Sequence, residues 1–200
     1  MGIWMRLLPG GMALFLTAAM AAQEEDPSKA HVRLYKKVAP AVVYVAGNGQ
    51  TGSGVIIDKK GIILTSTTAC GSSGETVTVI TKGHVQHKGK VIGRVNNKEL
   101  VLVKIQGENF PTVEFGDSEG VKPGQTTYVL GDSFGSILTD DTPALSVGVV
   151  SGLYELTKSN ARGSTYKGKG IETSAAVNPN QDGGPMVDRQ GRLLGIVTRA

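Results

Sequence analysis

The sequence predicts an all-β protein of antiparallel strands, and three observations lead to that fold class. Glycine accounts for 28 of the 200 residues, about twice the usual share, which is typical of short strands joined by tight turns. Runs rich in valine, isoleucine and threonine recur at intervals of roughly eight to twelve residues, separated by turn-forming residues. No long helical period is present. The pattern favours a β-sandwich or a β-barrel.

The first half of the chain shows this pattern element by element. A short segment around His31–Lys37 is compatible with a helix, which Pro40 ends because the residue before a proline disfavours helical backbone. Three apolar runs follow, and the Lys-Lys-Gly between the second and third predicts a hairpin turn. A longer stretch then alternates apolar and polar positions, with Lys82-Gly83 at its bend. The strands expected here are 41–47, 53–58, 61–67, 75–95 as a hairpin, and 99–105.

A connector rich in proline and glycine, residues 109–124, separates these strands from a second group. The second group repeats the pattern of short apolar runs between turn residues. Its expected strands are 126–132, 144–154, 170–177, 184–188 and 192–198. We therefore expect two β-barrels within residues 23–200, the first at about 23–108 and the second at about 125–200.

The composition is that of a globular protein, with 40% hydrophobic and 19% charged residues. The net charge of +4 is mild and the basic residues are scattered, so nucleic-acid binding is not expected. The single cysteine, Cys70, cannot form an intramolecular disulfide. It follows an apolar run, which favours a buried and unreactive thiol.

The N-terminus predicts an export signal over residues 1–22. Arg6 precedes an apolar stretch over Met12–Met20, and Ala19-Met20-Ala21 fits the small-x-small cleavage rule, with cleavage near Ala21 or Ala22. An uncleaved anchor is the alternative, although the stretch is short for a membrane span. We expect a periplasmic or extracellular protein that has no membrane attachment after cleavage.

Two glycine motifs and one histidine pair suggest other chemistry but stand in the wrong context. Residues 47–52 match the dinucleotide pattern G-x-G-x-x-G, yet a strand follows where a helix N-terminus is needed. Residues 131–135 match the nucleophile elbow G-x-S-x-G, but no convincing helix follows and all three histidines lie upstream. His84 and His87 would face opposite sides of a strand and could not easily clamp one ion. Turns are favoured, and neither a cofactor nor a metal is expected.

Five segments, in a fixed order, carry a family resemblance. They are GSGVIIDKKGIILTSTTAC (52–70), ELVLVKI (99–105), FGDSEGVKPGQTTYVLGDSFG (115–135), LSVGVVSGL (145–153) and ETSAAVNPNQDGGPMVDRQGRLLGIVT (172–198). From about Val38 to Val197 the chain resembles the HtrA/Deg branch of the trypsin-like serine proteases. The resemblance implies two six-stranded antiparallel β-barrels of the chymotrypsin/trypsin-like fold. The family pattern continues with a further strand, a helix and often a PDZ domain, so we expect a second barrel truncated at its C-terminus and no PDZ domain.

The resemblance also places the three catalytic positions of the family, and each holds a different residue in this chain. Thr68 stands where the family has its histidine, Glu99 where it has its aspartate and Asp182 where it has its serine. The mechanism needs a hydroxyl nucleophile, an imidazole base and a carboxylate that orients the imidazole. A threonine hydroxyl does not titrate near neutral pH, and Asp182 offers no hydroxyl. No catalytic residues are therefore expected.

The loop at Asp182 corresponds to the family's oxyanion hole, which the resemblance assigns to Asn180, Gln181 and Asp182. The family usually has glycine where Asn180 stands, but asparagine tolerates left-handed backbone better than most residues. Two alternatives stay open for Asp182: its carboxylate folds back onto the amides of 180–182, or it points into solvent. Two also stay open for Ala175, Ala176 and Val177, which either line a shallow pocket or belong to the core.

The expected function is that of a catalytically inactive relative, a pseudoprotease. Such a module holds an extended peptide or a protein partner, or it regulates an active protease of the same family. The alternative is a serine-type endopeptidase of the HtrA/Deg type with an unorthodox site. That site would use Ser133 or Ser174 with a lysine, or Asp182 with Thr68 and Glu99. The sequence does not identify the partner or the oligomeric state.

Overall fold

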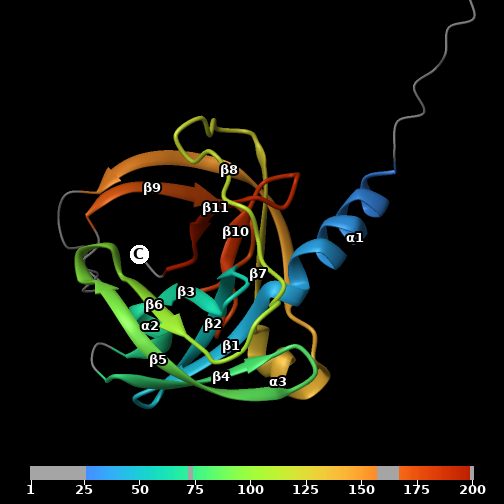
Figure 1. Cartoon of the computed structure of the whole chain (residues 1–200). Coiled ribbons are helices and arrows are strands. Elements are labelled where there is room, and N and C mark those ends of the chain that lie inside the picture. The colour runs from blue at the N-terminus through green and yellow to red at the C-terminus, as the bar shows by residue number, and fades with distance from the viewer. Residues whose placement is uncertain (1–25, 72–73, 157–166, 199–200) are drawn as a thin grey trace, which may run out of the picture.

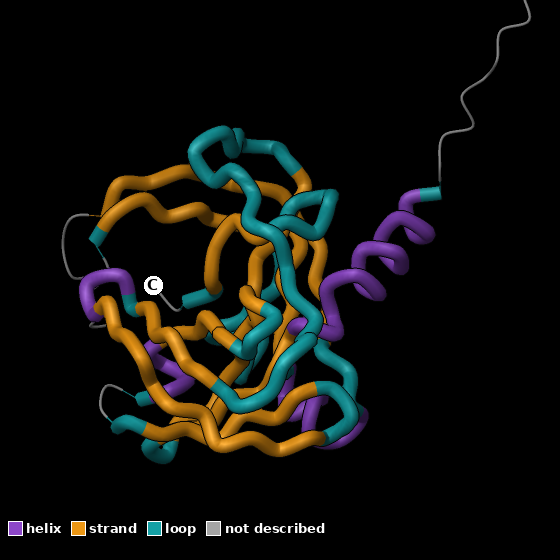
Figure 2. The backbone as a smooth tube through the Cα atoms, in the orientation of Figure 1, coloured by secondary structure: helices purple, strands orange, loops and turns teal. Residues whose placement is uncertain are grey.

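The computed structural model describes residues 26–71, 74–156 and 167–198 (Figure 1). The predicted signal peptide lies outside these residues. Within them, no helix combines the length and the apolar character that crossing a bilayer requires. The chain is mostly β-structure arranged in two sheets, with one longer helix near the N-terminus and short helical segments between strands (Figure 2).

The first sheet is a closed, antiparallel six-stranded barrel, in the order β1-β2-β3-β6-β5-β4. Alternate side chains of each strand point inward, and the β-branched Val45, Val55, Ile63 and Val103 among them are fully buried. Most of the buried hydrophobic residues belong to this barrel and its surroundings. The strands are β1 (Val42–Gly47), β2 (Gln50–Asp58), β3 (Ile62–Ser66), β4 (Thr76–Thr81), β5 (Val85–Val95) and β6 (Leu100–Lys104).

The second sheet has five antiparallel strands in the order β11-β10-β7-β8-β9, and it curls without closing among the described residues. Figure 1 shows it curving over the first barrel, with the β8–β9 hairpin at the top of the view. The prediction of an all-β, double-barrel chymotrypsin-like fold is confirmed, with the second barrel open among the described strands. The strands are β7 (Thr126–Gly131), β8 (Ala144–Leu156), β9 (Gly168–Thr173), β10 (Pro185–Val187) and β11 (Leu193–Ile196).

Helix α1 (Pro27–Val38) contains the segment predicted to be helical and starts earlier than expected. The Asp26 carboxylate caps its first turn by accepting a hydrogen bond from Ser28 N at 2.9 Å. Leu34 and Val38 are buried against the barrel core. Lys37 Nζ donates to the Gln190 carbonyl in the β10–β11 turn at 2.7 Å, so the helix also contacts the second sheet.

Short helical segments connect the strands. The expectation that no helix follows residues 131–135 is wrong. The Asp132 carboxylate accepts a hydrogen bond from Ile137 N at 2.7 Å and thereby stabilises a short turn of helix. These segments are η1 (Ala39–Ala41), α2 (Thr67–Cys70), η2 (Asn96–Lys98), η3 (Ser133–Gly135) and α3 (Ser136–Asp140).

The expected strand at 170–177 is wrong at its C-terminal end, because β9 stops at Thr173. Ala175 N donates to the Thr173 hydroxyl at 3.1 Å, which turns the chain away from the ladder. The prediction that Cys70 is buried is confirmed, since the residue is only 1% exposed. Burial raises the pKa of this thiol to about 11, although the Arg94 charge and a hydrogen bond with Thr65 lower it in part.

Candidate functional site

The loop that contains Asp182 is held between the two sheets by backbone hydrogen bonds. Ser53 N, on β2 of the first barrel, donates to the Asp182 carbonyl at 2.7 Å. On the other side, Gly183 N donates to the Val197 carbonyl at 2.8 Å, and Val197 N donates to the Gly184 carbonyl at 2.9 Å. The loop is therefore fixed where the first barrel meets the end of the second sheet.

Gly183 allows the loop to approach the first barrel closely. Its φ of +84° lies in the left-handed region that favours glycine. A Cβ at this position would stand 2.2 Å from the Ser53 carbonyl oxygen and 2.4 Å from the Thr65 hydroxyl. These distances leave no room for any other residue, so the sequence Asp-Gly-Gly has a packing reason as well as a conformational one.

Glu99 lies immediately before β6, and its contacts reach the end of the second sheet and the start of α2. Its side chain is buried, with 8% of the residue exposed, and its Oε2 accepts a hydrogen bond from the Thr198 hydroxyl at 2.6 Å. Its carbonyl oxygen accepts a hydrogen bond from Thr67 N, at the start of α2, at 2.9 Å. Its φ of +53° is unusual for a residue with a Cβ. Glu99 thus connects β6, α2 and the end of the second sheet.

Thr68 lies in α2, which follows β3 directly and is capped by Ser66. The Ser66 hydroxyl accepts a hydrogen bond from Ala69 N at 3.2 Å. Thr68 itself is partly exposed. The Cβ that Gly183 lacks would lie 3.0 Å from Ser66 N, so the loop containing Asp182 lies beside the start of α2. The structure therefore brings the regions of Thr68, Glu99 and Asp182 together from three separate parts of the chain.

The bend before Asp182 has the conformation that asparagine tolerates, since Asn180 has a φ of +70°. First-barrel hydroxyls hold this residue: Thr51 Oγ1 donates to Asn180 Oδ1 at 3.0 Å, and Ser53 Oγ donates to the Asn180 carbonyl at 2.7 Å. Asp182 is only 1% exposed, so the alternative that it points into solvent is wrong. Gln181 N donates to the Asn178 carbonyl at 3.1 Å, so that amide is not available for a fold-back contact with the Asp182 carboxylate.

Sequence reasoning named Gln181 in this loop but missed Ser53 and Asp132, two buried polar residues that support the bend. Gln181 is fully buried, and its Oε1 accepts a hydrogen bond from Asn178 N at 2.6 Å. The Ser53 hydroxyl, besides donating to Asn180, accepts a hydrogen bond from Asp132 N at 2.8 Å. Ser53 and Asp132 are far apart in sequence, and no local pattern points to their contact. The sole available signal was their position in two segments that resemble the family.

Asp132 is a buried carboxyl with an altered acidity. The residue is 0% exposed, and its Oδ2 accepts no hydrogen bond from the described residues. Burial raises the pKa of this carboxyl above its ordinary value, and the hydrogen bond from Ile137 N lowers it in part. The same buried charge adds to the effect of burial in raising the pKa of Tyr44. Asp132 supports the site indirectly, because its backbone N donates to the Ser53 hydroxyl that in turn donates to the Asn180 carbonyl.

The residues proposed as pocket lining lie in different environments. Ala175 is 5% exposed and belongs to a small core in the second sheet, with Val129, Met186 and Val197. Ala176 is exposed. Val177 is 44% exposed and lines the same groove as Glu99 and Thr198. The three residues therefore do not form one surface.

The serines of the alternative hydrolase hypothesis lie apart from Asp182 in the hydrogen-bond network. The Ser174 hydroxyl accepts a hydrogen bond from Val149 N at 3.0 Å. Ser133 begins η3 and is largely buried, with 9% of the residue exposed. No hydrogen bond joins either hydroxyl to a lysine among the residues that the structure describes. The structure thus provides no paired base for them.

The histidines of the chain are all described, and each has a place outside the site. The His31 ring packs edge-to-face against Tyr128, with 5.5 Å between ring centroids. The His87 ring packs in the same way against Phe110, and its Nε2 lies 3.1 Å from the Thr81 hydroxyl. His84 occupies the β4–β5 turn with a φ of +57°. Since the sequence contains three histidines, no imidazole of this chain lies at the site.

Comparisons with known proteins agree with this geometry. The family model of the trypsin-like peptidase domain matches residues 52–196. Protease Do-like 1, chloroplastic, of Arabidopsis thaliana is 31% identical over 187 residues, covering 84% of this chain and 41% of the relative. The probable periplasmic serine endoprotease DegP-like of Marinomonas sp. (strain MWYL1) is 30% identical over 145 residues, covering 72% of this chain and 29% of the relative.

The solved structure of Deg5 superposes with a TM-score of 0.73 at 28% sequence identity, covering 86% of this chain and 85% of that one. The chain spans less than half of the length of the two relatives named above. The matched family model covers most of the chain, from within β2 to the end of β11, and includes the loop that contains Asp182. The chain belongs to the trypsin-like peptidase domain family, and its fold is of the HtrA/Deg type.

Proposed function

We propose that this protein is a catalytically inactive member of its family, which uses the protease scaffold to bind a peptide or a protein. The observation that carries the proposal is the absence of an imidazole at the site, because all three histidines pack elsewhere. Acyl transfer in this family depends on a base that takes the nucleophile's proton and returns it to the leaving group. Neither Thr68 nor Asp182 provides that pair of functions.

The three proposed triad positions support this interpretation in different ways. Glu99 keeps a carboxylate, which accepts a hydrogen bond from the Thr198 hydroxyl, and all three imidazoles of the chain lie elsewhere. Asp182 is buried rather than presented to a substrate. In well-studied serine proteases, loss of the nucleophile or of the base alone lowers turnover by a factor on the order of 10⁶. Loss of both leaves no route to an acyl-enzyme.

A binding function is supported by the site's preserved packing. The loop at 178–184 keeps its hydrogen bonds to both sheets, and glycine stands at the position of closest approach. A scaffold of this kind recognises extended polypeptides through main-chain hydrogen bonds to strand edges. An active relative that presents a strand is one partner of this class. The predicted signal over residues 1–22, and the periplasmic name of one relative, support an exported location for this function.

Hydrolysis of casein and of a fluorogenic peptide tests the proposal. The purified protein is expected to show no turnover above a buffer control. Activity that disappears in the Asp182→Ala variant would contradict the proposal and assign the chemistry to this site. Activity that the substitution leaves unchanged would point to another site or to a contaminant, and purification to constant specific activity separates these two.

A further inference from the structure

A polar hollow lies on the outer face of the first barrel, where β1 meets the β4–β5 hairpin. It has a volume of about 440 Å³. None of the residues that line it belongs to the candidate site described above. Its polar lining includes Thr76, Thr78, Gln86 and Lys88.

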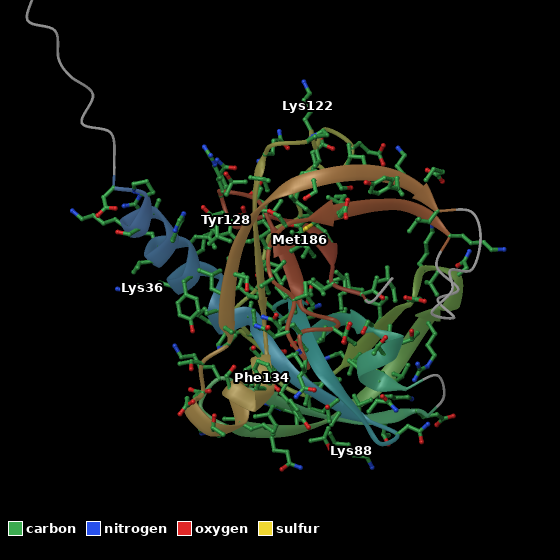
Figure 3. All side chains as sticks on the ribbon, turned by 180° about the vertical axis from the view of Figure 1, so that it is seen from behind. Lys36, Lys88, Lys122, Tyr128, Phe134 and Met186 are labelled. Carbon is green, nitrogen blue, oxygen red and sulfur yellow. The ribbon has the colours of Figure 1, made fainter. Side chains whose placement is uncertain are left out.

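The β4–β5 register gathers two threonines and two lysines beside this hollow. The residues that flank Thr78 on β4 are buried valines, so Thr76 and Thr78 point outward. Lys90 lies across from Thr76 and Lys88 across from Thr78. Both lysines are exposed, and Figure 3 shows Lys88 pointing away from the barrel. Because paired side chains on one face have Cβ atoms roughly 5 Å apart, these four residues form one group, the lysine–threonine cluster.

The cluster contains a repulsion that the described part of the fold does not offset. Lys90 also lies directly across from Lys104 on β6, and like charges in directly opposite positions destabilise a sheet. Lys104 Nζ donates to the Ile105 carbonyl at 2.7 Å, but a carbonyl does not neutralise its charge. No carboxylate of the described residues forms an ion pair with Lys88, Lys90 or Lys104. A bound anion would offset this repulsion.

The sequence of this hairpin reinforces the positive charge. Between Glu75 and Glu99 the chain contains four lysines and one arginine, and neither aspartate nor glutamate. The arginine, Arg94, is used within the fold, because its guanidinium donates to the Gly71 carbonyl at 2.7 Å. The lysines are left to attract a negatively charged ligand to this face of the barrel.

The donors of the cluster fit a phosphate monoester better than a carboxylate. Such an ester has three strong acceptor oxygens and carries about −1.5 to −2 charges near neutral pH. Two hydroxyls and two ammonium groups can satisfy all three oxygens, and lysine binds phosphate as a point charge. The ring in the lining, that of His87, packs against Phe110, so a nucleobase finds no stacking surface there.

We propose that the lysine–threonine cluster and the adjoining hollow bind a phosphate monoester, carried by a small soluble molecule or by a lipid headgroup. Lys88 and Lys90 supply the charge, and Thr76 and Thr78 donate hydrogen bonds to the phosphoryl oxygens. The hollow holds the adjoining part of the ligand. This inference is independent of the proposed function, because it uses no residue of the candidate site.

Isothermal titration calorimetry with glycerol 3-phosphate tests this inference at low ionic strength and about pH 8, where the ester is a dianion. We expect saturable binding to the wild-type protein and a weakening of about fivefold or more in the Lys88→Gln variant. The matched control is Lys122→Gln, which removes the same charge from an exposed position at the opposite end of the molecule (Figure 3). Its affinity should equal that of wild type.

Two further comparisons separate a built site from general attraction to a basic protein. Thr78→Val keeps every charge and nearly the same shape, and should weaken binding by about threefold or more. Succinate, a dianion with two separate carboxylates, should bind at least about fivefold more weakly than glycerol 3-phosphate. Equal weakening in both lysine variants, no effect of Thr78→Val, or equal affinity for the two anions would overturn the inference.

Sedimentation with vesicles distinguishes the two sources of the monoester. The probes are phosphatidylcholine vesicles with and without phosphatidic acid, whose headgroup is a phosphate monoester. Retention on the phosphatidic acid vesicles alone, lost in Lys88→Gln and kept in Lys122→Gln, would support the site with a lipid ligand. Binding of glycerol 3-phosphate without retention on vesicles would support it with a soluble ligand. Absence of binding in both experiments would overturn the inference, and the casein assay bears on catalysis alone.

Discussion

The hydroxyl of Thr198 donates a hydrogen bond of 2.6 Å to the carboxylate of Glu99, joining the end of the second sheet to the start of β6 in the first barrel. The contact lies at the position where the family's catalytic acid is expected. In this chain the carboxylate therefore helps to hold the two sheets together. Its conformation at a positive φ is compatible with such a structural role, since surrounding contacts must fix it.

The Thr198→Val substitution should destabilise the protein by about 1.5–3 kcal/mol, because the lost hydrogen bond involves a charged and buried acceptor. Urea unfolding followed by fluorescence measures this change. Thr76→Val is a matched control, since Thr76 is exposed on β4 and should change the free energy of unfolding by less than about 0.5 kcal/mol. Equal effects of the two substitutions would show that the Thr198–Glu99 contact contributes nothing.

Gly183→Ala should cost more stability than any glycine substitution that only imposes backbone strain. The added Cβ would meet the Ser53 carbonyl at 2.2 Å, whereas a Cβ at Gly49, whose φ of +75° is similar, meets nothing within 4 Å. Gly49→Ala should therefore cost about 1–2 kcal/mol for its conformation alone. Gly183→Ala should cost at least about 2 kcal/mol more. Chemical denaturation of both variants checks this, and similar values would mean that the loop is not pressed against the barrel.

Asp132→Asn should stabilise the protein at neutral pH and have little effect at low pH. Burial raises the pKa of Asp132 in the folded protein above its value in the unfolded chain. The carboxyl is therefore most favourable to folding at a pH low enough for it to be protonated in both the folded and the unfolded protein. That contribution is present below the unfolded pKa and is lost as the pH rises through the folded pKa. The substitution removes the buried charge and should add ~1 kcal/mol near pH 7.5.

Thermal and urea unfolding near pH 3.5 and pH 7.5 measure this difference. Asp140→Asn is the control, because Asp140 is exposed at the end of the neighbouring helix α3 and its carboxylate accepts a hydrogen bond from the exposed Thr139 hydroxyl. A gain for Asp132→Asn that is the same at both pH values would show that the buried charge is not its cause.

Cys70 should resist thiol reagents in the folded protein. With a pKa of about 11, the thiolate fraction at pH 8 is on the order of one in a thousand, and the residue is 1% exposed. Ellman's reagent should therefore release no thionitrobenzoate from the native protein and one equivalent in concentrated urea. Rapid release from the native protein would place the thiol at the surface.

The strands could be predicted from the sequence because their signal is local. Period-two alternation over 75–95 predicted the β4–β5 hairpin, and its bend lies at the expected place. Runs of β-branched residues indicated the buried strands. One error arose where a local side-chain contact ends a strand that the apolar pattern continues. The strand expected to run to Val177 ends at Thr173, because Ala175 N bonds to the Thr173 hydroxyl.

The supporting contacts of the site were beyond prediction because they join residues far apart in the sequence. Ser53 bonds to Asn180 and to Asp132, and Thr198 bonds to Glu99, each across a long stretch of sequence. None of these pairs has a periodic or motif signal, so only the folded arrangement of the two sheets brings them together. The proposed triad positions were named through resemblance to a family, whereas the residues that hold them in place emerged from the structure alone.

Intact-protein mass spectrometry after treatment with a fluorophosphonate, which labels activated serine hydroxyls, tests the central claim most directly. Trypsin serves as the positive control for the reagent. The wild-type protein should keep its unmodified mass, because no base activates a hydroxyl at the site. An adduct that maps to a serine of the native protein, and that blocks cleavage of casein, would contradict the proposal that this scaffold has no catalytic chemistry.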